Sequence, residues 1–122
     1  MQPRVRAWLA ACSDAGLDIL VTCTLRTYAE QATLYAQGRT APGRIVTYAR
    51  AGESAHNHGL AVDFVPLAAG KPQWSATHPH WRIAGELGEA AGLEWAGRWK
   101  RFREMPHLQM PVWREYLEER AA

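Results

Sequence analysis

The segment from Ser54 to Val65 reads SAHNHGLAVDFV and combines a polar loop with an apolar strand. Small and polar residues up to Gly59 indicate irregular structure, whereas residues 60–65 are apolar apart from one carboxylate, which favours a strand. Because strand side chains alternate between faces, Asp63 shares its face with apolar neighbours. A carboxylate in that position is costly to bury unless it is paired or bound to a metal ion. The segment therefore predicts a loop histidine, His56, close to a strand that carries a paired or metal-binding aspartate.

Outward from this strand, the apolar pattern predicts helices and short strands in mixed order. Apolar residues at positions 5, 8, 9 and 12 predict an N-terminal helix that ends near Gly16, and a capping box at Thr27-x-x-Glu30 begins a helix over 28–37. The connections are too short for repeated βαβ units, so we predict an α+β fold with a small, mainly antiparallel sheet flanked by helices. Further strands are predicted over 17–25, 44–49 and 107–110, and further helices over 79–91 and 112–120.

Length and charge restrict the kind of protein. The chain has 122 residues, 14 of them basic and 12 acidic, for a net charge of +2. This length fits one domain of about 100–150 residues. The balanced charge forms no basic stripe of the kind that nucleic-acid-binding proteins carry. We expect one domain over residues 1–122, a monomer, and no nucleic-acid partner.

The two cysteines, Cys12 and Cys23, show neither a CxxC spacing nor a disulfide framework. They fit reduced, partly buried thiols of a chain that folds in the cytosol, although pairing between them stays open. The N-terminal residues lack the apolar core of a signal peptide, and no apolar run approaches the roughly 20 residues that cross a bilayer. We expect synthesis in the cytoplasm without a signal peptide and no membrane insertion. A substrate outside the cytoplasm would then require delivery by another protein.

A second segment, Glu104-Met105-Pro106-His107, supplies another imidazole and another carboxylate. Catalytic zinc sites use three ligands from His, Asp or Glu and keep a fourth position open. Pro106 disfavours helical backbone at Met105, so this segment is not a helical HExxH motif. Glu104 must therefore lie in a turn to bring its carboxylate near His107. His58 is an alternative to His56 as a ligand, because an HxH pair can chelate.

The pattern SxHxxGxAxD at residues 54–63, followed by an acid three residues before a histidine, resembles the zinc D-alanyl-D-alanine carboxypeptidase family. That family includes VanX/VanY-type peptidases and phage L-alanyl-D-glutamate endolysins, and the phage branch is the most similar. The similarity spans roughly residues 20–110 and implies the hedgehog/DD-peptidase-like fold. Its motifs are Leu25-Arg26-Thr27 with Gln31, LYAQGRT at 34–40, Pro42-Gly43, Val46-Thr47, SAHNHGLAVDF at 54–64, and Trp99 through EMPHLQ at 104–109.

The resemblance assigns roles to individual residues. It implies Glu104 as general base and acid, where the phage branch often has Asp, and Arg26 as the arginine that binds substrate and polarises the scissile carbonyl. Four residues are expected to contact substrate: Ser54 and Gln31 by resemblance, and His58 and Trp99 as cleft-lining side chains. His58 departs from the tyrosine typical of its position. The zinc ligands implied are His56, Asp63 and His107.

The function implied by the resemblance is hydrolysis of peptidoglycan. We expect residues 1–122 to form a single catalytic peptidase domain that uses Zn²⁺ to cut the L-alanyl–D-glutamate bond of the stem peptide. It would act on the cell wall or periplasm after release, as a bacteriophage endolysin does. Two alternatives stay open: a D-Ala-D-Ala carboxypeptidase or dipeptidase, and a non-catalytic zinc module that only binds the cell wall.

Overall fold

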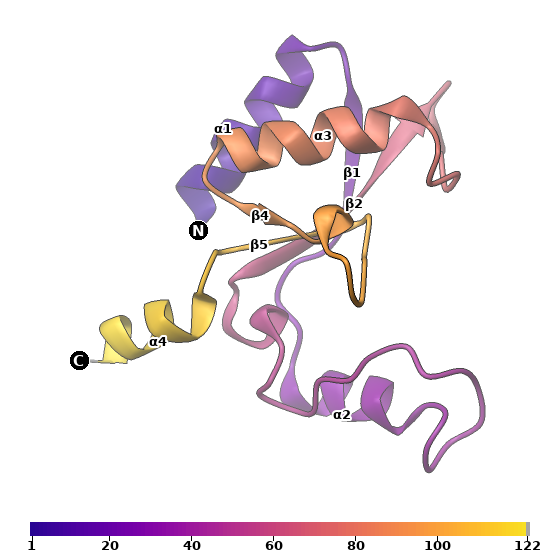
Figure 1. Ribbon diagram of the computed structural model, residues 1–122, viewed down its shortest axis with the longest axis vertical. Helices are drawn as coiled ribbons and strands as arrows, with labels where there is room; N and C mark the ends of the chain where they lie inside the picture. Colours follow the sequence, from indigo (N-terminus) through magenta and orange to yellow (C-terminus); the bar gives the residue numbers. More distant parts are fainter. Residues whose placement is uncertain (122) are drawn as a thin grey trace.

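The computed structural model describes residues 1–121, in which short strands lie between helices (Figure 1). No helix within this range has both the length and the apolar character needed to cross a membrane. The elements, in chain order, are α1 (Gln2–Asp14), β1 (Asp18–Cys23), α2 (Tyr28–Ala36), the 3-10 helix η1 (Ala55–His58), β2 (Ala61–Ala68), β3 (Lys71–Pro72), α3 (Pro79–Ala90), β4 (Glu94–Trp95), the 3-10 helix η2 (Ala96–Arg98), β5 (His107–Gln109) and α4 (Trp113–Ala121).

The strands form one antiparallel sheet in the order β1-β2-β5-β4, with β3 paired to β2. This confirms the predicted α+β fold with a small antiparallel sheet. β2 is the long inner strand, and its register places Asp63 directly opposite Cys23 on one side and His107 on the other. Side chains directly opposite each other in an antiparallel pair share a face of the sheet. The register therefore brings three chemically reactive side chains into one row.

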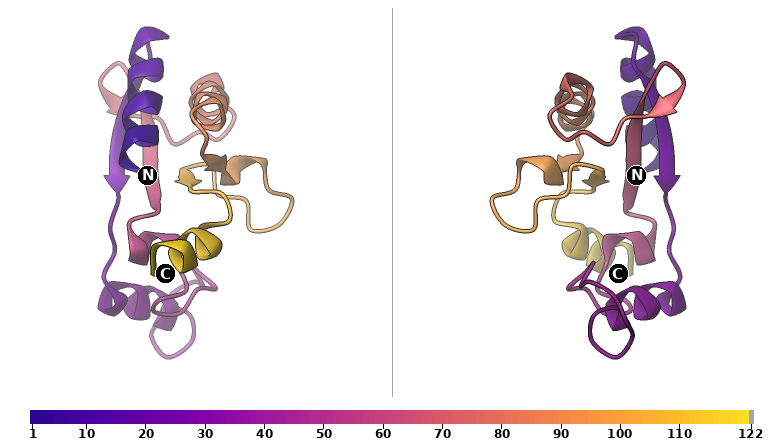
Figure 2. Two further views of the ribbon diagram at one scale, coloured as in Figure 1. Left: turned by 90° about the vertical axis from the view of Figure 1, so that its left-hand side faces the viewer. Right: turned by 90° about the vertical axis from the view of Figure 1, so that its right-hand side faces the viewer.

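The apolar core lies where α1 and α3 pack together over β2 (Figures 1 and 2). Phe64 of β2 is fully buried between Trp8 and Trp81, with ring centroids 5.1 and 5.4 Å away. The Trp8 indole N–H donates to the Ala84 carbonyl oxygen at 2.9 Å, so α1 and α3 are joined by a buried hydrogen bond as well as by packing. This core fixes β2, and with it the position of Asp63.

Helix α2 and the long loop after it lie at the opposite end of the molecule from α1 and α3 (Figure 1). The predicted capping box is confirmed: Glu30 N donates to Thr27 Oγ1 at 3.0 Å, and Thr27 N donates to Glu30 Oε1 at 2.9 Å. The strand predicted over 44–49 is wrong, because the segment pairs with no strand of the described chain. Side-chain hydrogen bonds from Gln37 to the Arg44 carbonyl and from Gln31 to the Ala49 carbonyl hold its backbone instead.

Two further differences concern the length of β2 and two short strands that were not predicted. β2 continues through Pro66 to Ala68, whereas the strand was predicted over 60–65. The Pro66 carbonyl accepts from Gln73 N at 2.9 Å, so the missing N–H of the proline also faces this end of the short β3 pairing, where the loss of a donor is tolerated. β3 and β4 have two residues each, which is too short to leave any periodic signal in the sequence.

Candidate metal centre

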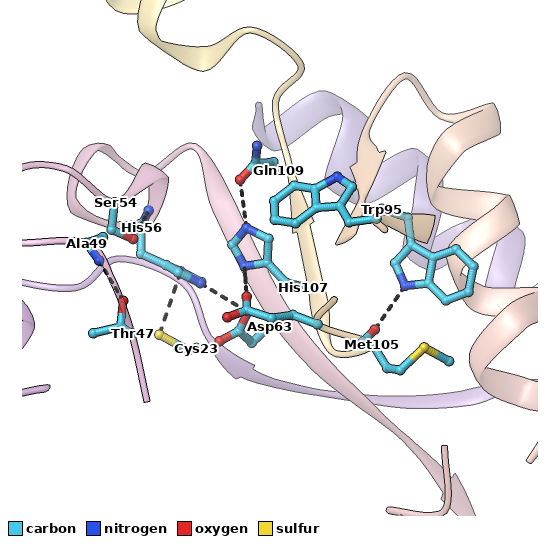
Figure 3. Close-up of polar contacts among 12 residues, drawn as sticks. Cys23, Thr47, Ala49, Ser54, His56, Asp63, Trp95, Met105, His107 and Gln109 are labelled. Atoms are coloured by element: carbon cyan, nitrogen blue, oxygen red, sulfur yellow. Dashed lines mark hydrogen bonds and ion pairs between the residues drawn. The ribbon is translucent and has the colours of Figure 1, made fainter. Parts of the chain in front are cut away.

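Two imidazoles converge on one carboxylate oxygen at the centre of the sheet (Figure 3). His56 Nε2 lies 3.0 Å from Asp63 Oδ1, and His107 Nδ1 lies 3.1 Å from the same oxygen. Both imidazoles are almost completely buried, whereas the Asp63 side chain keeps about a quarter of its surface exposed at 23%. The structure thus brings together the three predicted ligands, which are far apart in the sequence.

The second nitrogen of each imidazole ring has its own acceptor. His56 Nδ1 lies 2.8 Å from the Thr24 carbonyl oxygen, and His107 Nε2 lies 2.8 Å from Gln109 Oε1. A carbonyl oxygen can only accept, so each of these nitrogens carries a proton, which leaves His56 Nε2 and His107 Nδ1 as lone pairs in the neutral rings. Metal-binding histidines are oriented in this way by acceptors behind the ring. The sequence analysis did not assign either acceptor, although Gln109 lies inside the EMPHLQ motif.

With those tautomers, two lone pairs and a carboxylate oxygen face one another, an arrangement that requires a cation between them. Without a metal ion, protons supply the positive charge. Burial alone would lower the pKa of His107, but its hydrogen bonds to Asp63 and Gln109, together with the charges of Asp63 and Glu104, raise it above the ordinary value. Burial likewise opposes ionisation of Asp63, but hydrogen bonds from His107 and His56 hold its pKa well below its usual range. The chemistry of the donor set therefore fits a divalent metal ion.

Cys23 lies beside this centre, a position that the sequence analysis did not predict. Its Sγ lies 3.8 Å from His56 Nδ1, and Cys23, His56 and Asp63 are close enough together to hold an ion. However, the thiol approaches the ring nitrogen that is engaged with the Thr24 carbonyl, whereas the lone pair of His56 points to Asp63. Cys23 therefore lies behind the imidazole, whereas His107 faces the same Asp63 oxygen as His56 does.

Glu104 borders the centre from the loop before β5. His107 N donates to the Glu104 carbonyl oxygen at 3.2 Å, which closes a turn over these residues. The turn brings Glu104 Oε2 to 3.9 Å from His107 Nδ1, with the Glu104 side chain half exposed at 51%. This is the bent geometry that the sequence hypothesis required. A half-exposed carboxylate at the edge of a metal centre can exchange protons with solvent and with a bound reactant.

Arg26 approaches the opposite oxygen of the aspartate. Its guanidinium lies 3.8 Å from Asp63 Oδ2, donates to Cys23 Sγ at 3.5 Å and donates to Gln31 Oε1 at 2.9 Å. Gln31 was expected to contact substrate, but its side chain is fully buried and lies outside the cleft lining. Its amide nitrogen donates to the Ala49 carbonyl oxygen at 2.7 Å. Gln31 therefore joins Arg26 to the long loop.

The other expected substrate contacts divide in two. Ser54 and Trp99 line the same cleft as the metal centre; the Ser54 hydroxyl also accepts from His56 N at 3.3 Å, and the Trp99 indole donates to Glu94 at 2.9 Å. His58 does not line this cleft. Its ring stacks on Trp113 at 5.4 Å and its Nε2 bonds the Gly52 carbonyl oxygen, so it packs η1 against α4.

The cleft itself has a volume of about 1140 Å³ and opens over the metal centre. Ligand sites of small molecules span about 300–1,000 Å³, so this space suits a substrate of several residues. Its lining combines the centre with the two loops that carry Glu104 and residues 45–49. Two imidazoles and one carboxylate, with an acid beside them in an open cleft, are the kind of ligand set that catalytic zinc sites use.

Comparison with known proteins gives the family. The sequence profile of the D-alanyl-D-alanine carboxypeptidase family matches residues 47–110, and the chain belongs to this family. The chain is 43% identical over 109 residues to the peptidoglycan L-alanyl-D-glutamate endopeptidase CwlK of Bacillus subtilis, with 83% of this chain covered. It spans 65% of the length of that relative.

Solved structures confirm the DD-peptidase-like fold. The L-Ala D-Glu endopeptidase ChiX of Serratia marcescens superposes with a TM-score of 0.68 at 23% identity, over 93% of this chain and 79% of ChiX. The vancomycin-resistance D,D-pentapeptidase VanY, solved in complex with Zn(II), superposes with a TM-score of 0.66 at 16% identity, over 89% of this chain and 69% of VanY. At these identities the likeness concerns the fold alone.

Proposed function

We propose that this chain is a zinc-dependent peptidoglycan peptidase that hydrolyses the L-alanyl–D-glutamate bond of the stem peptide. The convergence of His56 Nε2 and His107 Nδ1 on Asp63 Oδ1 carries the proposal, because it builds a cation site in an open cleft. The 43% identity to an endopeptidase of this specificity supports the choice of bond. Residues 1–122 act as a single catalytic domain and as a monomer, and the activity is that of a phage-type endolysin on the cell wall.

His56, Asp63 and His107 would hold the zinc ion. Bound there, zinc would act as a Lewis acid toward the peptide carbonyl and would lower the pKa of a water molecule. The chain supports this role by orienting both imidazoles through the Thr24 carbonyl and Gln109. Such supporting hydrogen bonds typically account for about 10–100-fold in metal affinity or activity.

Glu104 is the general base and acid of the proposed reaction. Its carboxylate lies at the edge of the centre, 3.9 Å from His107 Nδ1, and half of its surface remains exposed. It takes a proton from the attacking water and returns that proton to the leaving amine, so the peptide bond breaks without a charged amide nitrogen as leaving group. General acid–base help of this kind contributes about 10²–10⁴-fold.

Arg26 binds the substrate oxygen on which charge develops. Its guanidinium is permanently charged, lines the cleft and is held by Gln31 at 2.9 Å. A fixed cation aimed at a developing oxyanion stabilises the transition state more than the ground state. The same guanidinium can donate two hydrogen bonds to a carboxylate of the stem peptide.

A D-Ala-D-Ala carboxypeptidase is the second candidate, because the description of the family itself specifies that activity. Both reactions use the same centre and differ in the bond released. Mass spectrometry of the products from a synthetic pentapeptide stem separates them. Release of L-alanine together with a fragment that begins with D-glutamate supports the endopeptidase, whereas release of free D-alanine refutes it.

Glu104→Gln is the direct test of the mechanism. We expect it to bind one zinc ion per chain and to lose about 10²–10⁴-fold in kcat. Glu53→Gln is the matched control, because Glu53 lines the same cleft and its carboxylate accepts a hydrogen bond from the Arg50 backbone N–H at 2.8 Å, away from the metal centre. Full activity of Glu104→Gln would exclude Glu104 as the base. A zinc-loaded wild type that binds the stem peptide without cleaving it would instead favour a zinc module that only binds the wall.

A further inference from the structure

Two exposed aromatic rings meet at the cleft, one from each of the loops that line it. Tyr48 belongs to the loop after α2 and Phe102 to the loop before β5, and their ring centroids lie 4.9 Å apart with planes inclined at 49°. Each residue is 65% exposed, although both line the cleft that contains the metal centre. Large apolar side chains that meet in solvent beside a reaction centre indicate a binding surface.

The backbone of Phe102 is strained. Its φ is +52°, a left-handed conformation that is unfavourable for a residue with a β-carbon. Burial of the ring does not repay this cost, since most of the ring is in solvent. The flanking loop is nevertheless firmly held: Arg103 Nε donates to the Trp99 carbonyl, Glu104 N donates to the Ala96 carbonyl, and Trp95 Nε1 donates to the Met105 carbonyl. Strain kept in a well-anchored loop is typical of functional positions.

Tyr48 likewise has an exposed side chain on a well-anchored stretch of backbone. The backbone on either side of it is anchored, because the Thr47 carbonyl accepts from Arg39 at 3.1 Å and the Ala49 carbonyl accepts from buried Gln31 at 2.7 Å. Ile45 and Val46, earlier in the same loop, also line the cleft and are about half exposed. These hydrogen bonds fix the backbone of the loop, and its apolar side chains face the cleft.

We propose that Tyr48 and Phe102 form an aromatic clamp, a pair of touching rings from two loops that contacts an acidic stem peptide and positions its scissile amide at the metal centre. This inference rests on the proposed function. With centroids 4.9 Å apart the two rings touch, so they leave no gap between them and instead form one apolar surface that joins the two loops, against which an extended peptide chain packs. Arg103, next to Phe102, lines the cleft without a carboxylate partner among the described residues and is available for the free carboxylates of such a peptide.

The test measures kcat and KM of the zinc-loaded protein on a synthetic stem peptide containing the L-Ala–D-Glu bond. Phe102→Ala and Tyr48→Ala are expected to raise KM about tenfold with kcat within about twofold, because the rings contribute to binding and not to the chemical step. Phe102→Tyr restores a ring and should restore KM. Tyr28→Ala is the control, since Tyr28 is 54% exposed but lies outside the cleft lining, and its KM should not change.

Phe102→Gly separates binding from folding. Glycine adopts a φ of +52° without strain, so this variant should resist urea better than the wild type and yet bind the peptide more weakly. Unchanged KM in both alanine variants would overturn the clamp. A loss confined to disaccharide-linked peptide, with free peptide bound normally, would assign the rings to the glycan and would overturn it as well.

Direct binding keeps the two proposals distinguishable. Calorimetry with the zinc-loaded Glu104→Gln protein and the same uncleaved peptide reports affinity without turnover. Wild-type cleavage with no effect of the clamp variants refutes the clamp alone. No cleavage by the wild type, together with peptide binding that weakens in Phe102→Ala, refutes the proposed reaction and leaves the clamp as a peptide-binding site.

Discussion

Replacing Gln31 by leucine should damage stability and activity together, because one buried amide joins Arg26 to the loop that borders the cleft. The Gln31 side chain accepts from Arg26 at 2.9 Å and donates to the Ala49 carbonyl at 2.7 Å. A hydrogen bond to a charged group contributes about 1.5–3 kcal/mol and a neutral one about 1 kcal/mol. We expect the free energy of unfolding to fall by about 2–4 kcal/mol. For a chain of this size the loss corresponds to a Tm lower by roughly 8–16 °C.

The effect on catalysis follows from the freed guanidinium. Without the Gln31 acceptor, the polar contacts of the Arg26 guanidinium within the described residues are the Cys23 sulfur at 3.5 Å and the ion pair with Asp63 at 3.8 Å. Misplacement of a substrate-binding group by about 1 Å can cost up to about 10²-fold. We therefore expect kcat/KM to fall about 10–100-fold at a temperature where the variant is fully folded.

Urea unfolding and stem-peptide kinetics on the same preparations test this prediction. Gln37→Leu is the matched control: Gln37 also anchors the loop, but through a single bond to the Arg44 carbonyl at 3.1 Å, so about 1 kcal/mol or less should be lost. A Gln31→Leu protein as stable as this control would refute the energetic argument. A destabilised protein with wild-type kcat/KM would show that Gln31 does not position Arg26.

Three further outcomes follow from the packing and the centre. Gly85→Ala would place a Cβ 2.1 Å from the buried Trp95 ring, and this overlap should outweigh the gain in helix propensity of about 1 kcal/mol. Urea unfolding should therefore show a free energy of unfolding lower by about 1–3 kcal/mol, and a stabilised protein would contradict the packing. Cys23→Ala should bind one zinc ion per chain by plasma mass spectrometry, because its thiol lies behind His56, whereas His107→Ala should bind zinc poorly; the reverse result would exchange the two ligands. In the metal-free protein the raised pKa of His107 adds stability that is complete below the ordinary value of 6.5 and is lost as pH rises through the raised pKa. Urea unfolding between about pH 5 and pH 9 should show this decline, and His107→Gln should remove it.

The sequence predicted those parts of the fold and the site that depend on residues a few positions apart. Asp63 on an apolar strand was identifiable because an unpaired buried carboxylate is costly, and Pro106 correctly excluded a helix before His107. The capping box at Thr27 likewise gave the start of α2 to the residue. These features depend on neighbours within a few positions, so a single sequence contains the information for them.

The register between strands and the roles of buried polar groups were beyond such reasoning. Nothing in the local sequence places Cys23 and His107 opposite Asp63 on its two neighbouring strands. The pairing of Cys23 with Asp63 depends in addition on a bulge in β1 between Val21 and Cys23. Gln31 was expected to contact substrate by resemblance to the family, and only the three-dimensional packing shows it buried behind Arg26.

The same register explains why a metal ion at this centre should stabilise the fold as well as enable chemistry. Asp63 comes from β2, His107 from β5, and His56 is oriented by the Thr24 carbonyl directly after β1, so three adjacent strands meet at one point. β5 has only three residues, and its attachment to β2 is correspondingly weak in hydrogen bonds alone. A ligand that binds only the folded state adds RT ln(1 + [L]/Kd), about 4 kcal/mol at a thousandfold excess over Kd. Zinc bound between β2 and β5 would thus hold the short strand, and with it the Glu104 turn, in the geometry that the reaction requires.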